Sequence, residues 1–521
     1  MPAGSRDRGD RRFVPGANLG PVHGAGNGRL PGRVVPRSRG SARYRDQLAA
    51  SSAPVPERNR DSDSEAVRET YSHAQAVSDD PTEPVARTDA SDAVAAPGCG
   101  RGRTIGDPPG PFSDPVRLAL WLCAFTLVAG GLLKGQCLAP WDDFHQYESL
   151  CYNDLQPLYT GRNIDDHVFP YVNEHIEYPV LTGLFMWASG FLATGINQYL
   201  IVSALLLAPF AFLITYLLAQ MTGRRALLWA AAPSLALYAF HNWDLLAVAS
   251  VVAGFWFWWR DRPAEAAICF GVGGAFKLYP LLFVAPLAFD ELARGGLKRG
   301  AAAAGVGGGV FAIINLPFVL ANFDGWWATY GFHRARGPNF DSIWALRDFG
   351  PISIPFMEPA TLNLVTGLLI ALFGLVAVVI GWWRYRNEGR FPFVATAAAL
   401  LAAFLAWNKV HSPQYALWIL PFFVMLRVHA GWWVAYTLAD LAAYVGVFRF
   451  FFDSCTANAG CLMPAEPTAA QQLMTAGVFA RAGLLVALFV IFLRAPAVIE
   501  RFPSHPPGTV REDRTTATGT A

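Results

Sequence analysis

Residues 361–383 read Thr361-Leu-Asn-Leu-Val-Thr-Gly-Leu-Leu-Ile-Ala-Leu-Phe-Gly-Leu-Val-Ala-Val-Val-Ile-Gly-Trp-Trp383, and none of these 23 residues is charged. A helix of about 20 apolar residues is long enough to cross the hydrocarbon core of a bilayer. Inside lipid only helices and closed barrels satisfy their backbone hydrogen bonds. This stretch therefore predicts a membrane-spanning helix.

Similar apolar runs repeat along the chain on both sides of this stretch. They lie near residues 117–134, 199–220, 226–240, 243–259, 264–289, 300–320, 391–407, 415–427, 431–451 and 476–493. Between positions 117 and 493 only 42 of 377 residues are charged, far below the quarter that is usual in a soluble domain. The expected fold is all-α, a polytopic transmembrane helical bundle with about 12 crossings, which excludes a soluble cytosolic enzyme.

Residues 1–116 have a different composition, since 31 of these 116 positions are charged and no apolar run of helix length occurs. Such a segment cannot bury enough apolar surface to offset the entropy lost on ordering. We expect disordered cytoplasmic tails at 1–116 and 494–521 around one membrane domain, 117–493. The net charge of only +2 argues against a nucleic-acid-binding protein.

The basic residues between the apolar runs predict the orientation. They are Arg117, Arg224, Arg225, Arg260, Arg262, Arg294, Lys298, Arg299, Arg384, Arg386, Arg390 and Arg427. The positive-inside rule assigns them to the cytoplasm. The alternate loops, 135–177, 241–244, 321–360, 408–414 and 452–475, hold most of the acids of the membrane segment. We expect a multi-pass protein of a bacterial plasma membrane with both termini cytoplasmic. Both termini lie on one side only if the number of crossings is even. This condition requires 178–193 to be a re-entrant or surface-lying helix, and it requires 264–289 to break into two short spans at Lys277–Pro280.

The cysteines fit this orientation. Cys137 and Cys151 share the first outer loop, and Cys455 and Cys461 share the last one. Disulfides persist in the oxidising space outside a plasma membrane. Two short-loop bridges are therefore plausible, with free thiols as the alternative for Cys137 and Cys151. None of the cysteine spacings matches a zinc site.

The first outer loop is crowded with carboxylates. They are Asp142, Asp143, Glu148, Asp154, Asp165, Asp166, Glu174 and Glu177. A carboxylate at a lipid–water boundary has its pKa raised by desolvation, which suits a general base acting on a sugar hydroxyl. The alternative for most of them is a solvated acidic loop whose charges oppose insertion.

Later outer segments add ionisable residues amid apolar sequence. Asp244 and Lys277 are functional hypotheses because charges there are expensive, although Lys277 could instead snorkel to the interface. Arg334 and Arg336 suit bidentate phosphate recognition or could balance neighbouring acids. His411 could donate to a phosphate or leaving group, or be satisfied within a turn. Since no P-loop or dinucleotide fingerprint occurs, a lipid-phosphate donor is favoured over a nucleotide sugar.

Several of these segments resemble glycosyltransferase family 87, the polyprenyl-phosphate-mannose-dependent alpha-mannosyltransferases of actinobacteria. The similar segments, in chain order, are Tyr152-Asn-Asp154-Leu-Gln-Pro-Leu-Tyr159, Phe169-Pro-Tyr171, Tyr178-Pro179, His241-Asn-Trp-Asp244, Phe276-Lys-Leu-Tyr-Pro280, Arg334-x-Arg336-Gly, Ser342-Ile-Trp344 and His411-Ser-Pro-Gln-Tyr415. The motifs are short, and their order and shared outer placement carry the resemblance over roughly residues 117 to 493.

The resemblance implies a GT-C fold with an active site formed by extracytoplasmic loops. It implies an inverting transfer of a mannosyl or related residue from a polyprenyl-phosphate sugar to an envelope glycolipid or polysaccharide. By motif position Asp154 would be the base, with Asp143 competing for that role and Glu177 and Asp244 as secondary candidates. His411, Lys277, Arg334, Arg336, Gln414 and Tyr415 would bind the donor phosphate or sugar.

Three questions stay open at this level. A transporter or flippase of lipid-linked sugar intermediates is the rival function, although its usual inverted repeats and midplane charges are not evident. No cofactor or metal is indicated, although the acidic loop could hold a divalent ion. The acceptor and the sugar are not fixed, since a polyprenyl-phosphate pentose would need the same phosphate grip.

Overall fold

The computed structural model describes residues 114–138, 144–346, 351–352, 354–457 and 467–501. The expectations for 1–113 and 502–521, for Asp143 and for Cys461 fall outside these residues. Within the described residues every named element is a helix. The α-helices are α1 (Pro115–Gly135), α2 (His145–Glu148), α3 (Leu155–Gly161), α4 (Val180–Gly190), α5 (Ile196–Thr222), α6 (Leu227–Ala230), α7 (Pro233–Tyr238), α8 (Asp244–Trp259), α9 (Pro263–Phe276), α10 (Val284–Gly295), α11 (Leu297–Ala321), α12 (Phe323–Ala335), α13 (Pro359–Glu388), α14 (Phe393–Trp407), α15 (Ala416–Met425), α16 (Ala430–Ala457) and α17 (Ala469–Arg494). The short 3₁₀ helices are η1 (Gln136–Leu138), η2 (Gly223–Ala226), η3 (Tyr279–Phe283) and η4 (Pro413–Tyr415).

Six segments of the described chain are long and apolar enough to cross a membrane, judged by length and composition. They contain α1, α5, α11, α13, α16 and α17, and shorter apolar helices, among them α8, α9 and α14, accompany them. The predicted all-helical, multi-pass membrane fold is confirmed. The number of crossings stays a prediction, because several shorter apolar helices do not reach the length of a full span.

Two predicted irregularities are present. Residues 180–190 form α4, whose eleven residues rise only about 16 Å, roughly half the thickness of a bilayer core. The break near Lys277 is also present, because α9 ends at Phe276 and Lys277 has extended backbone angles, φ −149° and ψ 145°. Pro280 in η3 lacks the N–H that would continue a helix.

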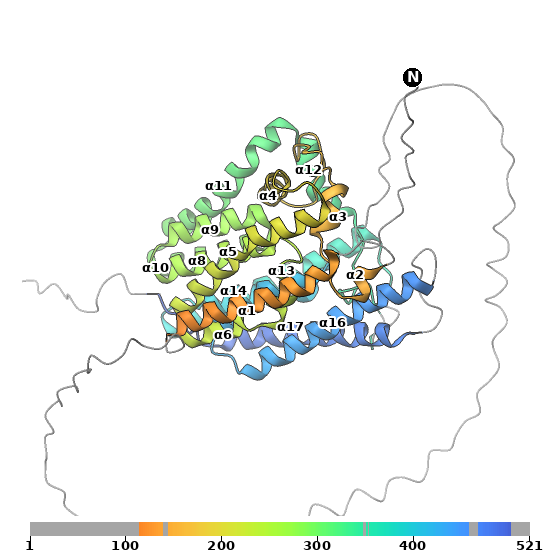
Figure 1. Ribbon diagram of the computed structural model, residues 1–521. Coiled ribbons are helices and arrows are strands. Elements are labelled where there is room, and N and C mark those ends of the chain that lie inside the picture. The colour runs from red at the N-terminus through yellow and green to blue at the C-terminus, as the bar shows by residue number, and fades with distance from the viewer. Residues whose placement is uncertain (1–113, 139–143, 347–350, 353, 458–466, 502–521) are drawn as a thin grey trace, which may run out of the picture. The chain divides into compact units, whose positions relative to one another are not determined.

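The loops that the charge pattern grouped together do meet in space. At one end, Arg225 donates to the carbonyl of Leu426 (2.6 Å) and Arg384 to that of Leu493 (2.7 Å). At the other end, the backbone N–H of Asp154 donates to the carbonyl of His241 (2.8 Å). Figure 1 shows α3 and α12 near this second end of the long helices, and α6 and α10 near the first.

The C-terminal boundary differs from the expected one. Helix α17 ends at Arg494, and residues 495–501 continue as a strap across the helix ends. The N–H of Val498 donates to Met425 O (2.8 Å), and that of Arg427 donates to Pro496 O (2.9 Å). The expectation of a disordered tail from residue 494 is therefore wrong for 494–501. Backbone hydrogen bonds and the charge of Arg501 hold this strap in place, and a search for apolar runs does not detect either of them.

Candidate active site

A cavity of about 750 Å³ lies where the predicted outer loops meet. Its walls come from the segment before α3, from α12 and the loop that follows it, and from the 408–415 segment. Seven residues singled out in the sequence line it, namely Asp154, Glu177, Lys277, Arg334, Arg336, Gln414 and Tyr415. Asp244 and His411 do not line it, and Asp143 lies outside the described residues.

Asp154 stands at the N-terminus of α3 and is partly buried. Its carboxylate accepts hydrogen bonds from Asn242 Nδ2 (2.7 Å) and Tyr152 Oη (3.1 Å). Burial raises the pKa of Asp154, whereas the Asn242 hydrogen bond and the charge of Lys277 oppose the rise, and the net pKa lies above the usual 3.8. The cavity wall thus holds a carboxylate that is more basic than an ordinary aspartate.

The other carboxylates near the cavity are engaged by cations. Glu177 pairs with Arg162 (2.5 Å), Asp244 pairs with Lys277 (3.1 Å), and Asp341 lies 3.5 Å from Arg481. Asp244 also accepts a hydrogen bond from Trp418 Nε1 (2.7 Å), which explains why it points away from the cavity. Asp154 has no ion-pair partner among the described residues, which separates it from these three.

Lys277 does not extend to the membrane surface. It is 9% exposed, and its ammonium lies 5.2 Å from the ring centroid of Tyr178 and 5.7 Å from that of Tyr415. These rings and the carboxylate of Asp244 surround the charge, so the snorkelling alternative is wrong. Lys277 therefore presents a largely compensated charge to the cavity.

A second group of cations lacks carboxylate partners. Arg334, Arg336 and Lys409 all line the cavity, and within the described part of the chain none of them forms an ion pair. Arg336 Nε is buried without an acceptor. An uncompensated guanidinium beside an ammonium is the arrangement that binds an anion such as a phosphate.

Lys409 was missed by the sequence reading. Its Nζ donates to the carbonyls of Arg336 (2.5 Å) and Arg334 (3.3 Å), which ties the 408–415 segment to the end of α12. Burial, together with the nearby charge of Arg336, lowers the pKa of Lys409 to about 8. The signal in the sequence that could have found it is a lysine between two apolar runs.

His411 lies outside the cavity wall. Its Nδ1 is 3.1 Å from the carbonyl of Leu405, and its backbone N–H donates to Asn339 Oδ1 (2.9 Å). Burial, and then the charge of Arg481, lower the pKa of His411 well below its usual range, so the imidazole is neutral. The geometry gives no support to the expected phosphate contact of His411, because the turn after Lys409 directs the imidazole into the helix bundle.

Helix α12 forms part of the cavity wall and is docked on the first outer loop. Thr329 Oγ1 donates to Ile176 O (2.7 Å), and His333 Nε2 lies 2.9 Å from Glu177 O. The close fit requires a glycine, because a Cβ on Gly325 would lie 1.9 Å from the carbonyl oxygen of Tyr171. These contacts fix the end of α12 that carries Arg334.

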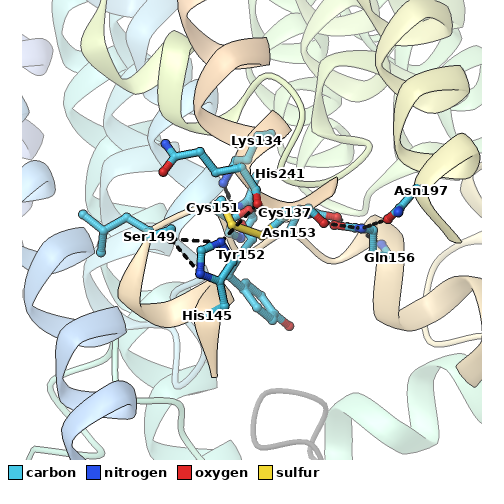
Figure 2. The surroundings of a disulfide bond; sticks show 12 residues. Lys134, Cys137, His145, Ser149, Cys151, Tyr152, Asn153, Gln156, Asn197 and His241 are labelled. Atoms are coloured by element: carbon cyan, nitrogen blue, oxygen red, sulfur yellow. Dashed lines mark hydrogen bonds between the residues drawn. A yellow bond between two sulfur atoms is a disulfide. The ribbon is translucent and has the colours of Figure 1, made fainter. Parts of the chain in front are cut away.

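A disulfide joins Cys137 to Cys151, with a Cα–Cα distance of 5.6 Å. Figure 2 shows it between the end of α1 and the segment that leads to Tyr152 and Asn153. The predicted first bridge is therefore confirmed, and the alternative of free thiols there is wrong. The bond anchors the backbone directly before Asp154. Among the described residues no cluster of three or more His, Cys, Asp or Glu side chains is arranged to hold a metal.

Comparisons with known proteins agree with the resemblance seen in the sequence. GPI mannosyltransferase 1 of Saccharomyces cerevisiae is 24% identical over 201 residues, which cover 35% of this chain and 47% of the relative. The chain thus spans about half the length of the curated relative it matches, and no solved structure matches it significantly. Residues 176–407 match the model of glycosyltransferase family 87, a range that includes Lys277, Arg334 and Arg336 but neither Asp154 nor Lys409. The segment 176–407 is therefore similar to glycosyltransferase family 87, in a chain whose long apolar helices are those of a multi-pass membrane protein.

Proposed function

We propose that the protein transfers a mannosyl residue from a polyprenyl-phosphate donor to a hydroxyl of an envelope glycolipid or polysaccharide, on the outer face of a bacterial plasma membrane. The observation that carries this proposal is the composition of one cavity. Among the described residues, it combines a carboxylate of raised pKa without an ion-pair partner, Asp154, with three cations that form no ion pair, Arg334, Arg336 and Lys409. Such a transfer requires a general base that accepts the proton of the acceptor hydroxyl and cations that stabilise the leaving phosphate.

The choice of sugar and donor rests on the family and on the similarity to an enzyme named as a mannosyltransferase. A lipid-linked donor is in keeping with a cavity built among membrane helices. The disulfide between Cys137 and Cys151 favours an oxidising compartment for this end of the molecule, and hence the extracytoplasmic face.

In the proposed step the acceptor oxygen attacks the anomeric carbon of a beta-linked sugar, and its proton passes to a carboxylate oxygen of Asp154. The bond between the anomeric carbon and the phosphate oxygen breaks as the new bond forms, so the configuration inverts. The electron pair of that bond leaves with the polyprenyl phosphate. Arg336, Lys409 and Arg334 stabilise the developing negative charge, and Lys277 is a weaker contributor because Asp244 already compensates it.

Since these cations can meet the charge of a monophosphate leaving group, we propose that the transfer needs no metal ion. Gln414 and Tyr415 line the same cavity and are proposed to contact the donor sugar. The oxygen Oε1 of Gln414 is buried without a donor, and a sugar hydroxyl would satisfy it.

The test is an assay of purified protein in proteoliposomes with radiolabelled polyprenyl-phosphate mannose and an octyl alpha-mannoside acceptor, with membrane glycolipid extract as a second acceptor. We expect a labelled product that is alpha-linked and forms equally well in the presence of a chelator. Movement of the labelled lipid across the bilayer without any sugar transfer would instead favour the flippase.

A further inference from the structure

The basic residues of the chain are almost all arginines, and its few lysines differ in their surroundings. Only four of the 41 Lys and Arg residues are lysines: Lys134, Lys277, Lys298 and Lys409. Lys277 and Lys409 line the cavity, and Lys298 lies exposed at the start of α11, among the predicted inner loops. Lys134 has no part in the transfer step described above. A lysine inside a membrane-spanning helix is nevertheless costly, and marks a function by default.

Lys134 lies in the last turn of α1 and is 1% exposed. Its ammonium donates to Tyr152 O (2.6 Å) and Tyr444 Oη (3.1 Å), and lies 3.2 Å from His241 Nδ1. An ammonium has three donors and no acceptor, so Nδ1 of His241 accepts and every N–H of Lys134 has a partner. Figure 2 shows Lys134, His241 and Tyr152 close to the disulfide.

The backbone two residues before the carbonyl that Lys134 binds is strained. Leu150 has a φ of 57°, in the left-handed region that disfavours a branched side chain, and its carbonyl accepts a hydrogen bond from Tyr444 Oη (2.5 Å). A residue in such a conformation is strained and persists only when its surroundings hold it. Lys134 and Tyr444 grip the carbonyls on either side of Cys151, while the disulfide fixes Cys151 itself.

The hydrogen bonds of Lys134 and Tyr444 to the carbonyls of Tyr152 and Leu150 form a clamp, and its members also contact Asp154. Tyr152, whose carbonyl Lys134 binds, donates its hydroxyl to Asp154 Oδ1 (3.1 Å). His241 is the second partner of Lys134, and its backbone carbonyl accepts a hydrogen bond from the backbone N–H of Asp154 (2.8 Å). We propose that Lys134 is a positioning residue for Asp154, which holds the strained segment 150–152 in place and supplies a positive charge that favours the ionised base. The catalytic part of this proposal rests on the proposed function.

The charged and titratable groups that face Lys134 and Asp154 come from several elements. They are Tyr147 and Tyr152 of the first loop, Tyr178 before α4, His241 and Asp244 at the start of α8, Lys277 after α9, and Tyr444 of α16. Lys277 also acts on Asp154 but is paired with Asp244, so removal of Lys134 takes away a positive charge that no carboxylate of this group pairs with. The ionised form of Asp154 would then be less favoured.

The test compares Lys134→Met with Lys298→Met, the matched control, in the mannosyl-transfer assay. In Lys134→Met we expect kcat to fall by about tenfold or more with the donor KM within about twofold, and the acid limb of the pH–rate profile to move to higher pH. Lys134→Arg keeps the charge and should keep the wild-type acid limb. A wild-type kcat and pH profile in Lys134→Met, or a loss confined to KM, would overturn the proposal.

A second measurement does not depend on catalysis. We expect dithiothreitol to reduce the Cys137–Cys151 bond faster in Lys134→Met and in Tyr444→Phe than in wild type or Lys298→Met, as followed by mass spectrometry of alkylated peptides. Tyr444→Phe also serves if Lys134→Met does not fold. Reduction at the wild-type rate in the variants that fold would refute the clamp. If the wild type transfers no sugar but the rates differ as expected, the proposed function fails while the clamp stands.

Discussion

Asp154 differs from the other carboxylates of the cavity in its surroundings. Glu177 and Asp244 each lie within ion-pair distance of a cation. Asp154 receives only the neutral donors Asn242 and Tyr152, and burial raises its pKa. A general base works best when its pKa approaches the working pH. The rate should therefore fall as the pH falls through the raised pKa of Asp154, at higher pH than for an exposed aspartate.

Replacement of Asp154 by Asn should remove the base and leave both hydrogen-bonded neighbours in place. We expect the transfer rate to fall by about 10² to 10⁴, with unchanged yield and gel-filtration behaviour in detergent. Asp165→Asn, at an exposed position of the same loop, is the control and should keep wild-type activity. Transfer by Asp154→Asn at the wild-type rate would instead shift the search for the base to Asp341 or Glu177.

The lowered pKa of Lys409 predicts a second dependence of the proposed reaction on pH. Because its pKa is lowered to about 8, the ammonium is charged below that pH and loses its proton above it. If Lys409 binds the donor phosphate, the KM for the donor should rise as the pH increases through about 8. Lys409→Arg stays charged and should abolish this rise. A donor KM that rises equally in the wild type and in Lys409→Arg would show that another group titrates there.

At the scale of elements, the cavity depends on how α12 docks on the first outer loop. The helix approaches residues 171–177 so closely that hydrogen bonds from Asn322 and Thr329 reach the carbonyls of Val172 (3.0 Å) and Ile176 (2.7 Å). Arg334 and, just beyond the helix, Arg336 take their positions from this contact. A small shift of α12 would therefore move the expected phosphate site relative to Asp154.

Two glycines of α12 allow this dependence to be measured. A Cβ at position 325 would meet the carbonyl oxygen of Tyr171 at 1.9 Å, whereas a Cβ at position 331 meets nothing within 4 Å. Gly325→Ala should lower transfer by about tenfold, since small displacements of binding groups are amplified in the rate. Gly331→Ala should be active and slightly more stable, by up to about 1 kcal/mol, because alanine favours a helix. Equal activity of both variants would show that the docking of α12 does not govern the site.

At the scale of the described bundle, the two ends carry different chemistry. The cavity end has cations that form no ion pair among the described residues, whereas the opposite end contains a buried cluster of paired charges. There Arg501, with its side chain 2% exposed, pairs with Asp261 (2.5 Å), Asp290 (3.2 Å) and Glu291. Buried charges are stable only when they are paired, so the strap 495–501 is part of the folded unit.

The strap can be tested by removing its charge. Arg501→Met would leave the buried carboxylates of Asp290 and Glu291 with weaker compensation, from Arg294 (3.0 Å) and Arg299 (3.8 Å). We expect a loss of roughly 3–5 kcal/mol of stability, seen as a lower melting temperature in detergent. Arg390→Met breaks a neighbouring exposed pair with Glu500 and should change the melting temperature little. Equal melting of the two variants would contradict the structural role of Arg501.

The amino-acid sequence by itself determined the fold class and the sorting of charges. Helical membrane spans follow from runs such as 361–383, because lipid offers no partners for an exposed backbone. The break at Lys277–Pro280 and the short helix near 180–190 followed from the placement of proline and charge. The crowded acidic loop and the family resemblance also identify Asp154 as the candidate base, and that role stays a prediction.

Tertiary structure alone decided which side chains share the cavity. Lys409 and His411 are two residues apart in a segment without helical or strand periodicity, so the sequence cannot say which of them faces the cavity. In the sequence, Lys134 is a single charged residue at the end of an apolar run. Only the folded chain brings its partners, up to 310 positions away, into hydrogen-bond distance. Pairing of charges is a property of distances through space, and only the packed helices set those distances.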